Sequence, residues 1–206
     1  MSYSDFKTLE QAIAAFDLTI KNDYHLFASI ESVEPSKWLV DWLSNTVDLA
    51  TTISTEKARS ELIITPILLE IRALFQVGYF SGNTFNVDES KSLTGVCDFL
   101  LTASANQVVI DAPVVAIVEA KDNDIRSGLG QCAAEMVAAW IFNDRQGCPD
   151  RVIWGVVTTG SNWRFLRLRG GRDLEVDLSE YSISQLPQIL GILSQPFKQV
   201  SVKPSK

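Results

Sequence analysis

The stretch Val114-Val115-Ala116-Ile117-Val118-Glu119-Ala120-Lys121 decides the fold class and the chemistry of this chain. Its five unbroken apolar residues are typical of a buried strand, since a strand at the surface would alternate apolar and polar residues. The strand ends in Glu-x-Lys, and alternation puts Glu119 and Lys121 on the same face. Burying two ionisable groups there is costly unless they pair or hold a metal ion. The sequence therefore predicts a chemical site at this strand end.

A third acid, Asp98, lies in a second strand-like segment, Gly95-Val96-Cys97-Asp98. Asp98 and Glu119, at the ends of neighbouring strands, can share one Mg²⁺, a cation that prefers oxygen ligands and keeps several waters. The carbonyl of Ala120 offers a further oxygen. A bound cation lowers the pKa of a water and neutralises charge on a phosphate. Lys121 can orient or deprotonate the attacking water, or stabilise the transition state. These residues predict phosphodiester hydrolysis with Mg²⁺, or with Mn²⁺ in its place.

The composition is that of a globular protein with an acidic balance. The chain has 206 residues, 46% hydrophobic and 21% charged, which suits one domain with a substantial core. Its net charge of −7 excludes a protein that simply coats DNA, because such proteins carry a basic surplus. Three widely spaced cysteines fit reduced core thiols, and neither a signal-peptide pattern nor a membrane-length apolar run is present. We therefore expect a cytoplasmic protein without membrane contact.

Apolar periodicity divides the chain into helices and strands. Helical stripes dominate the part before Gly78, and strand-like runs follow, interrupted by one long helix. This order favours an α/β fold, on the border of α+β, with a mixed central sheet flanked by helices. We expect a helical extension at 1–52, a core domain at 53–200 and a frayed tail at 201–206. The expected helices are 5–21, 35–43, 56–77, 125–142 and 183–193; the expected strands are 84–88 (after a turn at 81–83), 95–102, 108–110 with 113–121, 151–159, 163–169 and 174–178.

These motifs resemble the PD-(D/E)xK, or restriction-endonuclease-like, superfamily, nearest in pattern to the N-terminal nuclease domains of type I restriction subunits. The matching residues are Asp98, Glu119 and Lys121, preceded by Arg59-Ser60-Glu61 and a helix that runs to Gly78. The resemblance covers residues 56–180, and Cys97 stands where the family has a proline. It implies an αβββαβ core, with the acidic cluster at the centre of the sheet.

Two glutamates compete for the role of an acid contributed by the helix before the first core strand. Glu61 and Glu70 differ by nine positions, which at about 100° per residue places them on opposite flanks of one helical stripe. Geometry does not choose between them. The resemblance favours Glu61, with Glu70 as the alternative, and the one not used is a solvated helix residue.

Polar residues after the Glu-x-Lys strand offer further candidates. Gln131 occupies the place of a glutamine common in related nucleases and can position the site, although a surface role is equally expected. Arg167 and Arg169 share one strand face and, with Arg164, can follow a phosphate backbone. A solvated sheet face or a protected sheet edge explains these arginines at least as well.

The leading hypothesis is a Mg²⁺-dependent endonuclease acting on DNA. The rival is a catalytically silent module that keeps the nuclease fold to bind protein or nucleic acid, which the acidic charge favours. DNA is the expected partner. The resemblance also implies a homodimer, since many duplex cutters must cut both strands, and a partner protein that supplies specificity is a further expectation.

Overall fold

The chain folds around one mixed sheet flanked by helices, which confirms the expected α/β class. The computed structural model describes residues 2–198, so the expected tail at 201–206 and the last two residues of the core domain lie outside the described residues. The strands are β1 (Thr19–Asp23), β2 (Gly78–Thr84), β3 (Val96–Thr102), β4 (Val114–Ala120), β5 (Ile153–Thr158), β6 (Asn162–Arg169), β7 (Asp173–Asp177) and β8 (Tyr181–Ser182). Their order is β1-β7-β6-β5-β4-β3-β2, and β8 pairs with β6.

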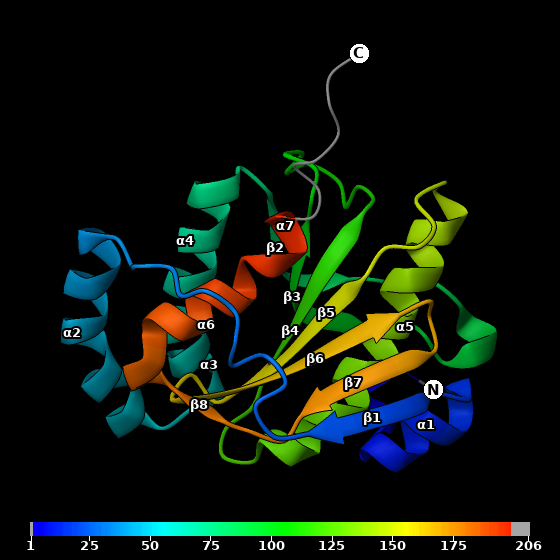
Figure 1. Ribbon diagram of the computed structural model, residues 1–206, viewed down its shortest axis with the longest axis horizontal. Helices are drawn as coiled ribbons and strands as arrows, with labels where there is room; N and C mark the ends of the chain where they lie inside the picture. Colours follow the sequence, from blue (N-terminus) through cyan, green and yellow to red (C-terminus); the bar gives the residue numbers. More distant parts are fainter. Residues whose placement is uncertain (1, 199–206) are drawn as a thin grey trace.

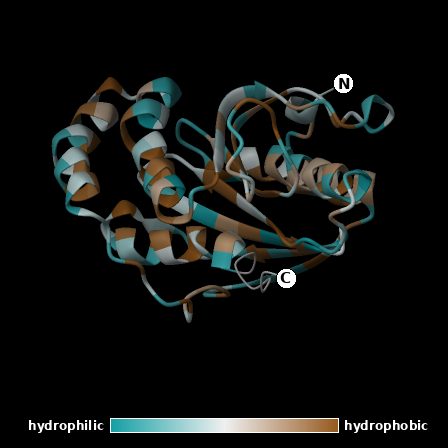
Figure 2. Cartoon of the chain, turned by 90° about the horizontal axis from the view of Figure 1, so that it is seen from above, coloured by the Kyte–Doolittle hydropathy of each residue, from teal (hydrophilic) through white to brown (hydrophobic). Residues whose placement is uncertain are grey.

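Helices cover both faces of this sheet. The longer ones are α1 (Leu9–Phe16), α2 (Lys37–Ile53), α4 (Thr65–Phe75), α5 (Leu129–Arg145) and α6 (Leu186–Leu193). Apolar residues of α2, α4 and α6 pack on one face, and those of α1 and α5 pack on the other (Figure 1). Figure 2 shows the apolar central strands, in brown, between these helix layers. The short elements are α3 (Glu56–Arg59), α7 (Gln195–Lys198), a π-helical turn η2 (Ser60–Ile64), and the 3₁₀ turns η1 (Tyr3–Asp5), η3 (Glu89–Lys91), η4 (Ile125–Gly128) and η5 (Ile183–Gln185).

Strand β4 lies inside the sheet and is buried along its whole length. It runs antiparallel to β3 and parallel to β5. Ile117 packs with the α5 layer, whereas Val118 and Ala120 pack with the α4 and α6 layer. Because side chains alternate along a strand, Glu119 faces α5.

The N-terminal part is not the purely helical extension expected for residues 1–52. The helix expected over 5–21 ends at Phe16, because Asp17 adopts the left-handed conformation with φ 52°. The β-branched pair Thr19 and Ile20 then opens β1, which pairs in parallel with β7 at the sheet edge. This segment is therefore part of the sheet.

Strand β2 begins earlier than expected. It starts at Gly78 and pairs with β3 through Thr84, so the turn expected at 81–83 lies inside a strand and the strand expected at 84–88 is wrong. Glycine is needed at position 78, since a Cβ there would come 2.3 Å from the Thr102 hydroxyl.

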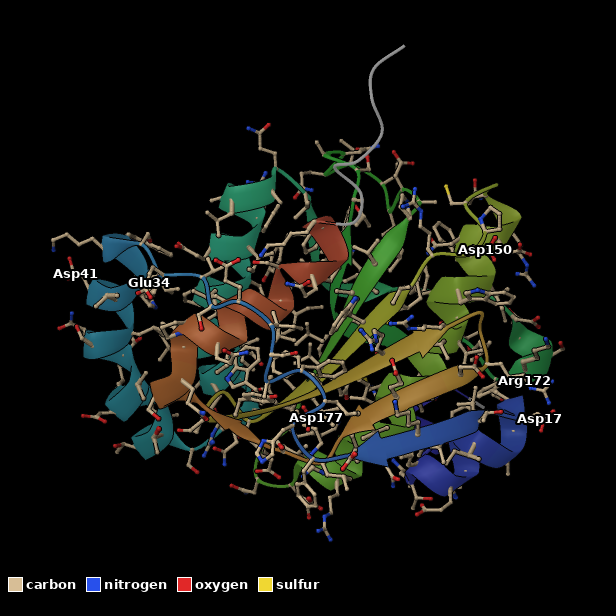
Figure 3. All side chains as sticks on the ribbon, viewed as in Figure 1. Asp17, Glu34, Asp41, Asp150, Arg172 and Asp177 are labelled. Carbon is tan, nitrogen blue, oxygen red and sulfur yellow. The ribbon has the colours of Figure 1, made fainter. Side chains whose placement is uncertain are left out.

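Asp177, at the end of β7, fastens the connection between β1 and α2 to the sheet. It is fully buried and accepts hydrogen bonds from the amides of His25 (3.0 Å), Phe27 (3.3 Å) and Ser179 (2.9 Å) and from the Tyr181 hydroxyl (2.9 Å). Figure 3 labels Asp177 beside the blue segment that leaves β1. Every buried oxygen of this acid is used to hold the fold.

Candidate active site

Strands β3 and β4 bring Asp98 near Glu119. The ladder pairs Phe99 with Val118, so each acid lies one position beyond this pair. Asp98 Oδ2 accepts a hydrogen bond from the backbone amide of Ala120 at 2.8 Å, and the charge of Asp98 raises the pKa of Glu119. Two neighbouring carboxylates repel when both are ionised, so this pair favours binding a proton or a cation.

Glu119 and Lys121 form an ion pair at the end of β4. Lys121 Nζ lies 2.5 Å from Glu119 Oε1, and the Glu119 side chain is only 1% exposed. Burial, followed by the Asp98 carboxylate, raises the pKa of Glu119 to about 8, although the Lys121 ammonium works in the opposite direction. Burial disfavours the charged form of Lys121, but the charge and hydrogen bond of Glu119, together with the charges of Asp98 and Glu56, outweigh burial and raise the pKa of Lys121. Glu119 therefore keeps a proton up to weakly alkaline pH unless another cation replaces it.

Helix α5 adds a second buried acid, Glu135, which was not predicted. Its side chain is fully buried, and Gln131 Nε2 donates a hydrogen bond to its Oε1 at 3.1 Å. Burial, and then the charge of Glu119, raise the pKa of Glu135 well above its usual range. The sequence carried a signal, because Glu135 interrupts an apolar helical run at 133–137 and poses the same burial problem as Glu119.

Both buried glutamates leave one oxygen unused. Glu119 Oε2 and Glu135 Oε2 are inaccessible to solvent and have no hydrogen-bond partner among residues 2–198. An unpaired buried carboxylate oxygen costs free energy, so a fold gains nothing from it. The unpaired oxygen of each acid is therefore able to bind a cation or carry a proton.

A further acid whose pKa responds to the charges of this site is Glu56, at the start of α3. Burial, and then the nearby Asp98 carboxylate, raise the pKa of Glu56, while Lys121 lowers it. Thr55 caps α3 by accepting the Ala58 amide at 3.1 Å, which places Glu56 in the first turn.

Neither glutamate expected in this role is brought to the site. Glu61 is exposed and lies 3.7 Å from Lys57 on the same helical surface. Glu70 is buried, but its two carboxylate oxygens accept from the Ser36 amide at 2.7 Å and the Ser36 hydroxyl at 2.8 Å. Glu70 thus holds the start of α2, and a role for either glutamate at the site stays a prediction.

The arginines of β6 are engaged in ion pairs. Arg164 lies 2.8 Å from Glu180, and Arg167 and Arg169 lie 2.5 Å and 3.6 Å from Glu175 on β7. Partner carboxylates thus accompany all three arginines, and their role in following a phosphate backbone stays a prediction.

The donor set suits a small, hard cation that keeps its waters. In the described part of the chain, no group of three or more His, Cys, Asp and Glu side chains could hold a metal ion. The site offers instead the second oxygen of Asp98 and the unpaired Oε2 of Glu119. Two carboxylate oxygens fit Mg²⁺, which usually binds through one or two carboxylates and several waters. The Ala120 carbonyl stays a predicted ligand.

Comparison with known proteins gives no relative. No family model, no curated protein and no solved structure matches the chain. Between residues 2 and 198, no helix is long and apolar enough to cross a membrane.

Proposed function

We propose that this protein is a metal-dependent nuclease that hydrolyses phosphodiester bonds in DNA. The observation that carries the proposal is the buried Glu119, which has one oxygen on Lys121 and the other without a partner among residues 2–198, and which lies near the Asp98 carboxylate on the neighbouring strand. A carboxylate kept in this costly state, with a strongly shifted pKa, is typical of functional sites.

The order of elements supports a restriction-endonuclease-like core. From α4 to β5 the chain runs α4-β2-β3-β4-α5-β5, which is the αβββαβ order that the resemblance implies. The acids lie on β3 and β4, which are neighbours inside the sheet and not at its edges.

Each residue has a role that follows from its contacts. Asp98 and Glu119 would hold Mg²⁺ or Mn²⁺, which when bound supplies a water of lowered pKa and neutralises charge at the phosphate. Glu119 would be ionised in that state, because a carboxylate that binds a metal ion must be deprotonated. Lys121, held against Glu119, orients the attacking water or stabilises charge in the transition state. Gln131 is fixed with its Nε2 on Glu135, which leaves its amide oxygen as an acceptor on the other side.

The decisive assay incubates purified protein with supercoiled plasmid and with labelled DNA oligonucleotides, in Mg²⁺, Mn²⁺ or a chelator. We expect cleavage only with metal, and a loss of about 10²-fold or more in Glu119→Gln and in Lys121→Ala. Glu56→Gln should slow cleavage, whereas the matched control Glu61→Gln should cut like the wild type. Undiminished cleavage by both Glu119→Gln and Lys121→Ala would overturn the mechanism.

The second candidate is a nuclease-fold module that binds protein or nucleic acid without cutting. The net charge of −7 favours it, and so does the finding that no group of three or more His, Cys, Asp and Glu side chains among residues 2–198 could hold a metal ion. Metal-dependent stabilisation separates the two, since a competent site gains RT ln(1 + [L]/Kd) from a bound cation. A folded protein whose melting temperature does not rise in millimolar Mn²⁺ supports the binding module.

A further inference from the structure

Helix α2 carries a line of large apolar side chains that stays open to solvent. Trp38, Trp42, Leu49 and Ile53 are between 38% and 51% exposed. At about 100° per residue, these positions and the exposed Asn45 fall within about 80° of the helix surface. These five residues form the α2 stripe. Figure 1 shows α2 at the outer margin of its helix layer, so the stripe is an accessible apolar surface at one edge of the molecule.

The stripe is separate from the face by which α2 joins the core. The buried residues of α2 are Leu39, Leu43 and Ala50, and they lie on a neighbouring line about 100° away. Apolar residues scattered singly over a surface are ordinary, whereas a contiguous apolar patch marks a place of contact with another molecule. The packing of α2 on its own chain therefore does not explain the stripe.

The two tryptophans of the stripe are held in place before any partner binds. Their ring centroids lie 6.0 Å apart, and Trp42 Nε1 donates a hydrogen bond to the Leu62 carbonyl at 3.0 Å. Tryptophan is among the side chains that contribute most to protein interfaces, and a side chain that is already fixed loses little conformational entropy on binding. Trp38 and Trp42 are thus suited to anchor a protein interface.

The stripe is complementary to a second copy of itself. Positions 38 and 53, and positions 42 and 49, lie at equal distances on either side of the midpoint between Asn45 and Thr46. When two α2 helices pack antiparallel about a two-fold axis, each tryptophan therefore faces an aliphatic side chain of the other copy. The smaller Asn45 and Thr46 meet at the axis, where the two helices come closest. A self-complementary surface of this kind fits a symmetric dimer.

The area and charge of the stripe fit a weak dimer. At its observed exposure the stripe offers roughly 350 Å² of apolar side chain per copy. With the polar flanks of α2, the two copies together bury about 1,000 Å², the lower end of the range for a specific interface. Asp41 and Asp48 lie along one flank, and only Asp41 is paired, with Lys37 at 2.5 Å, among the described residues. The remaining repulsion keeps the dimer weak, and salt should screen it.

We propose that two copies of this chain associate through the α2 stripe, with their α2 helices antiparallel about a two-fold axis between Asn45 and Thr46. The inference goes beyond the proposed function and does not rest on it, because no residue of the stripe belongs to the site at Glu119.

The test is sedimentation equilibrium of the full chain across the micromolar range, at low and at high salt. We expect a reversible dimer that salt strengthens. Leu49→Glu places a charge opposite Trp42 of the other copy and should weaken association by about 100-fold or more. Val40→Glu is the matched control, since Val40 is 47% exposed on the opposite side of α2 and should dimerise as the wild type does. Circular dichroism checks that both variants are folded.

Cysteine cross-linking tests the geometry of the dimer. Asn45→Cys places a thiol beside the two-fold axis and should give a disulfide-linked dimer under mild oxidation. Ser44→Cys, exposed on another side of α2, should not. The wild type measures the background from its own cysteines, of which Cys97 and Cys132 are buried.

A wild type that stays monomeric across the whole range would overturn the second copy as the partner. Equal association of Leu49→Glu and the wild type, or equal loss in Leu49→Glu and Val40→Glu, would overturn the stripe as the interface. Cross-linking of Ser44→Cys in place of Asn45→Cys would overturn the arrangement about the axis. Cleavage of DNA is scored separately: a stripe-dependent dimer that does not cut leaves this inference standing and refutes the nuclease, and a monomer that cuts does the reverse.

Discussion

The buried acids on the two faces of this sheet differ in how completely their carboxylate oxygens are hydrogen-bonded. Asp177 accepts four hydrogen bonds and ties a long connection to β7. Glu119 and Glu135 are just as buried, but each leaves an oxygen without a partner in the described structure. Buried polar atoms in folded proteins are nearly always paired, so an exception needs a reason. An acid whose oxygens are all hydrogen-bonded stabilises the fold, whereas an acid with an unpaired oxygen can still bind a ligand.

The largest expected difference between Asp177 and Glu119 is the change in the free energy of unfolding when each is substituted. Asp177→Ala leaves several buried donors unpaired, at about 1–3 kcal/mol each, and should lower the free energy of unfolding by about 3 kcal/mol or more. At pH 7 the folded protein holds a proton on Glu119 that the unfolded chain has released, which costs stability, and Glu119→Gln removes this cost, so its free energy of unfolding should be unchanged or higher. Urea denaturation at pH 7 measures both.

Asp173→Ala is the matched control for Asp177→Ala. Asp173 lies on the same strand, β7, but is exposed, so its removal should change the free energy of unfolding by no more than about 0.5 kcal/mol. If Asp177→Ala and Asp173→Ala are equally mild, Asp177 does not hold the fold and the comparison fails.

The next effect is a pH dependence of stability in metal-free protein. Glu119 has a pKa of about 8 when folded, above its ordinary 4.5. Between these values the folded state holds a proton that the unfolded state has released, so the free energy of unfolding falls as pH rises from about 5 to 8. Urea denaturation in a chelator should show this fall, and Glu119→Gln should flatten it.

A divalent cation should reverse that loss at pH 8. It binds the ionised form of Glu119, and at 100 times its Kd it stabilises the fold by about 2.7 kcal/mol. The gain should shrink toward pH 5, where protons compete for the carboxylates. If Mn²⁺ stabilises Glu119→Gln as much as it stabilises the wild type, the cation binds at another place in the protein.

The sequence predicted part of this site, and the missing part has physical reasons. The Glu119 and Lys121 strand end was predictable because five apolar residues precede it. The position of Glu56 was not, because counting 100° per residue fails across the π-helical turn η2, which changes the angular spacing of the helix. The pairing of Arg167 also depends on Glu175, from a strand whose register the sequence does not specify.

The edge strand β1 was missed for a similar reason. Its residues are all exposed, so no apolar alternation marks it, and only its pairing with β7 makes it a strand. Local pattern predicts elements that bury a face, whereas an exposed edge depends on a distant partner.

The smallest expected effect concerns Glu135. It tests whether this acid stabilises the fold, as Asp177 does, or is an unsatisfied buried group like Glu119. Glu135→Gln keeps an oxygen for the Gln131 amide and removes the charge. Because burial raises the pKa of Glu135, the wild type is neutral there at low pH, and the variant should match its stability near pH 5. As pH rises above the ordinary pKa of a glutamate, the folded wild type holds a proton that the unfolded chain has released, so its stability falls and the variant should become the more stable of the two by an amount that grows with pH. Glu70→Gln is the opposite control, since both its oxygens accept from Ser36, and it should lose about 1 kcal/mol. A Glu135→Gln variant that is less stable than wild type at every pH would make Glu135 a structural acid, and would leave Glu119 alone as the unsatisfied group.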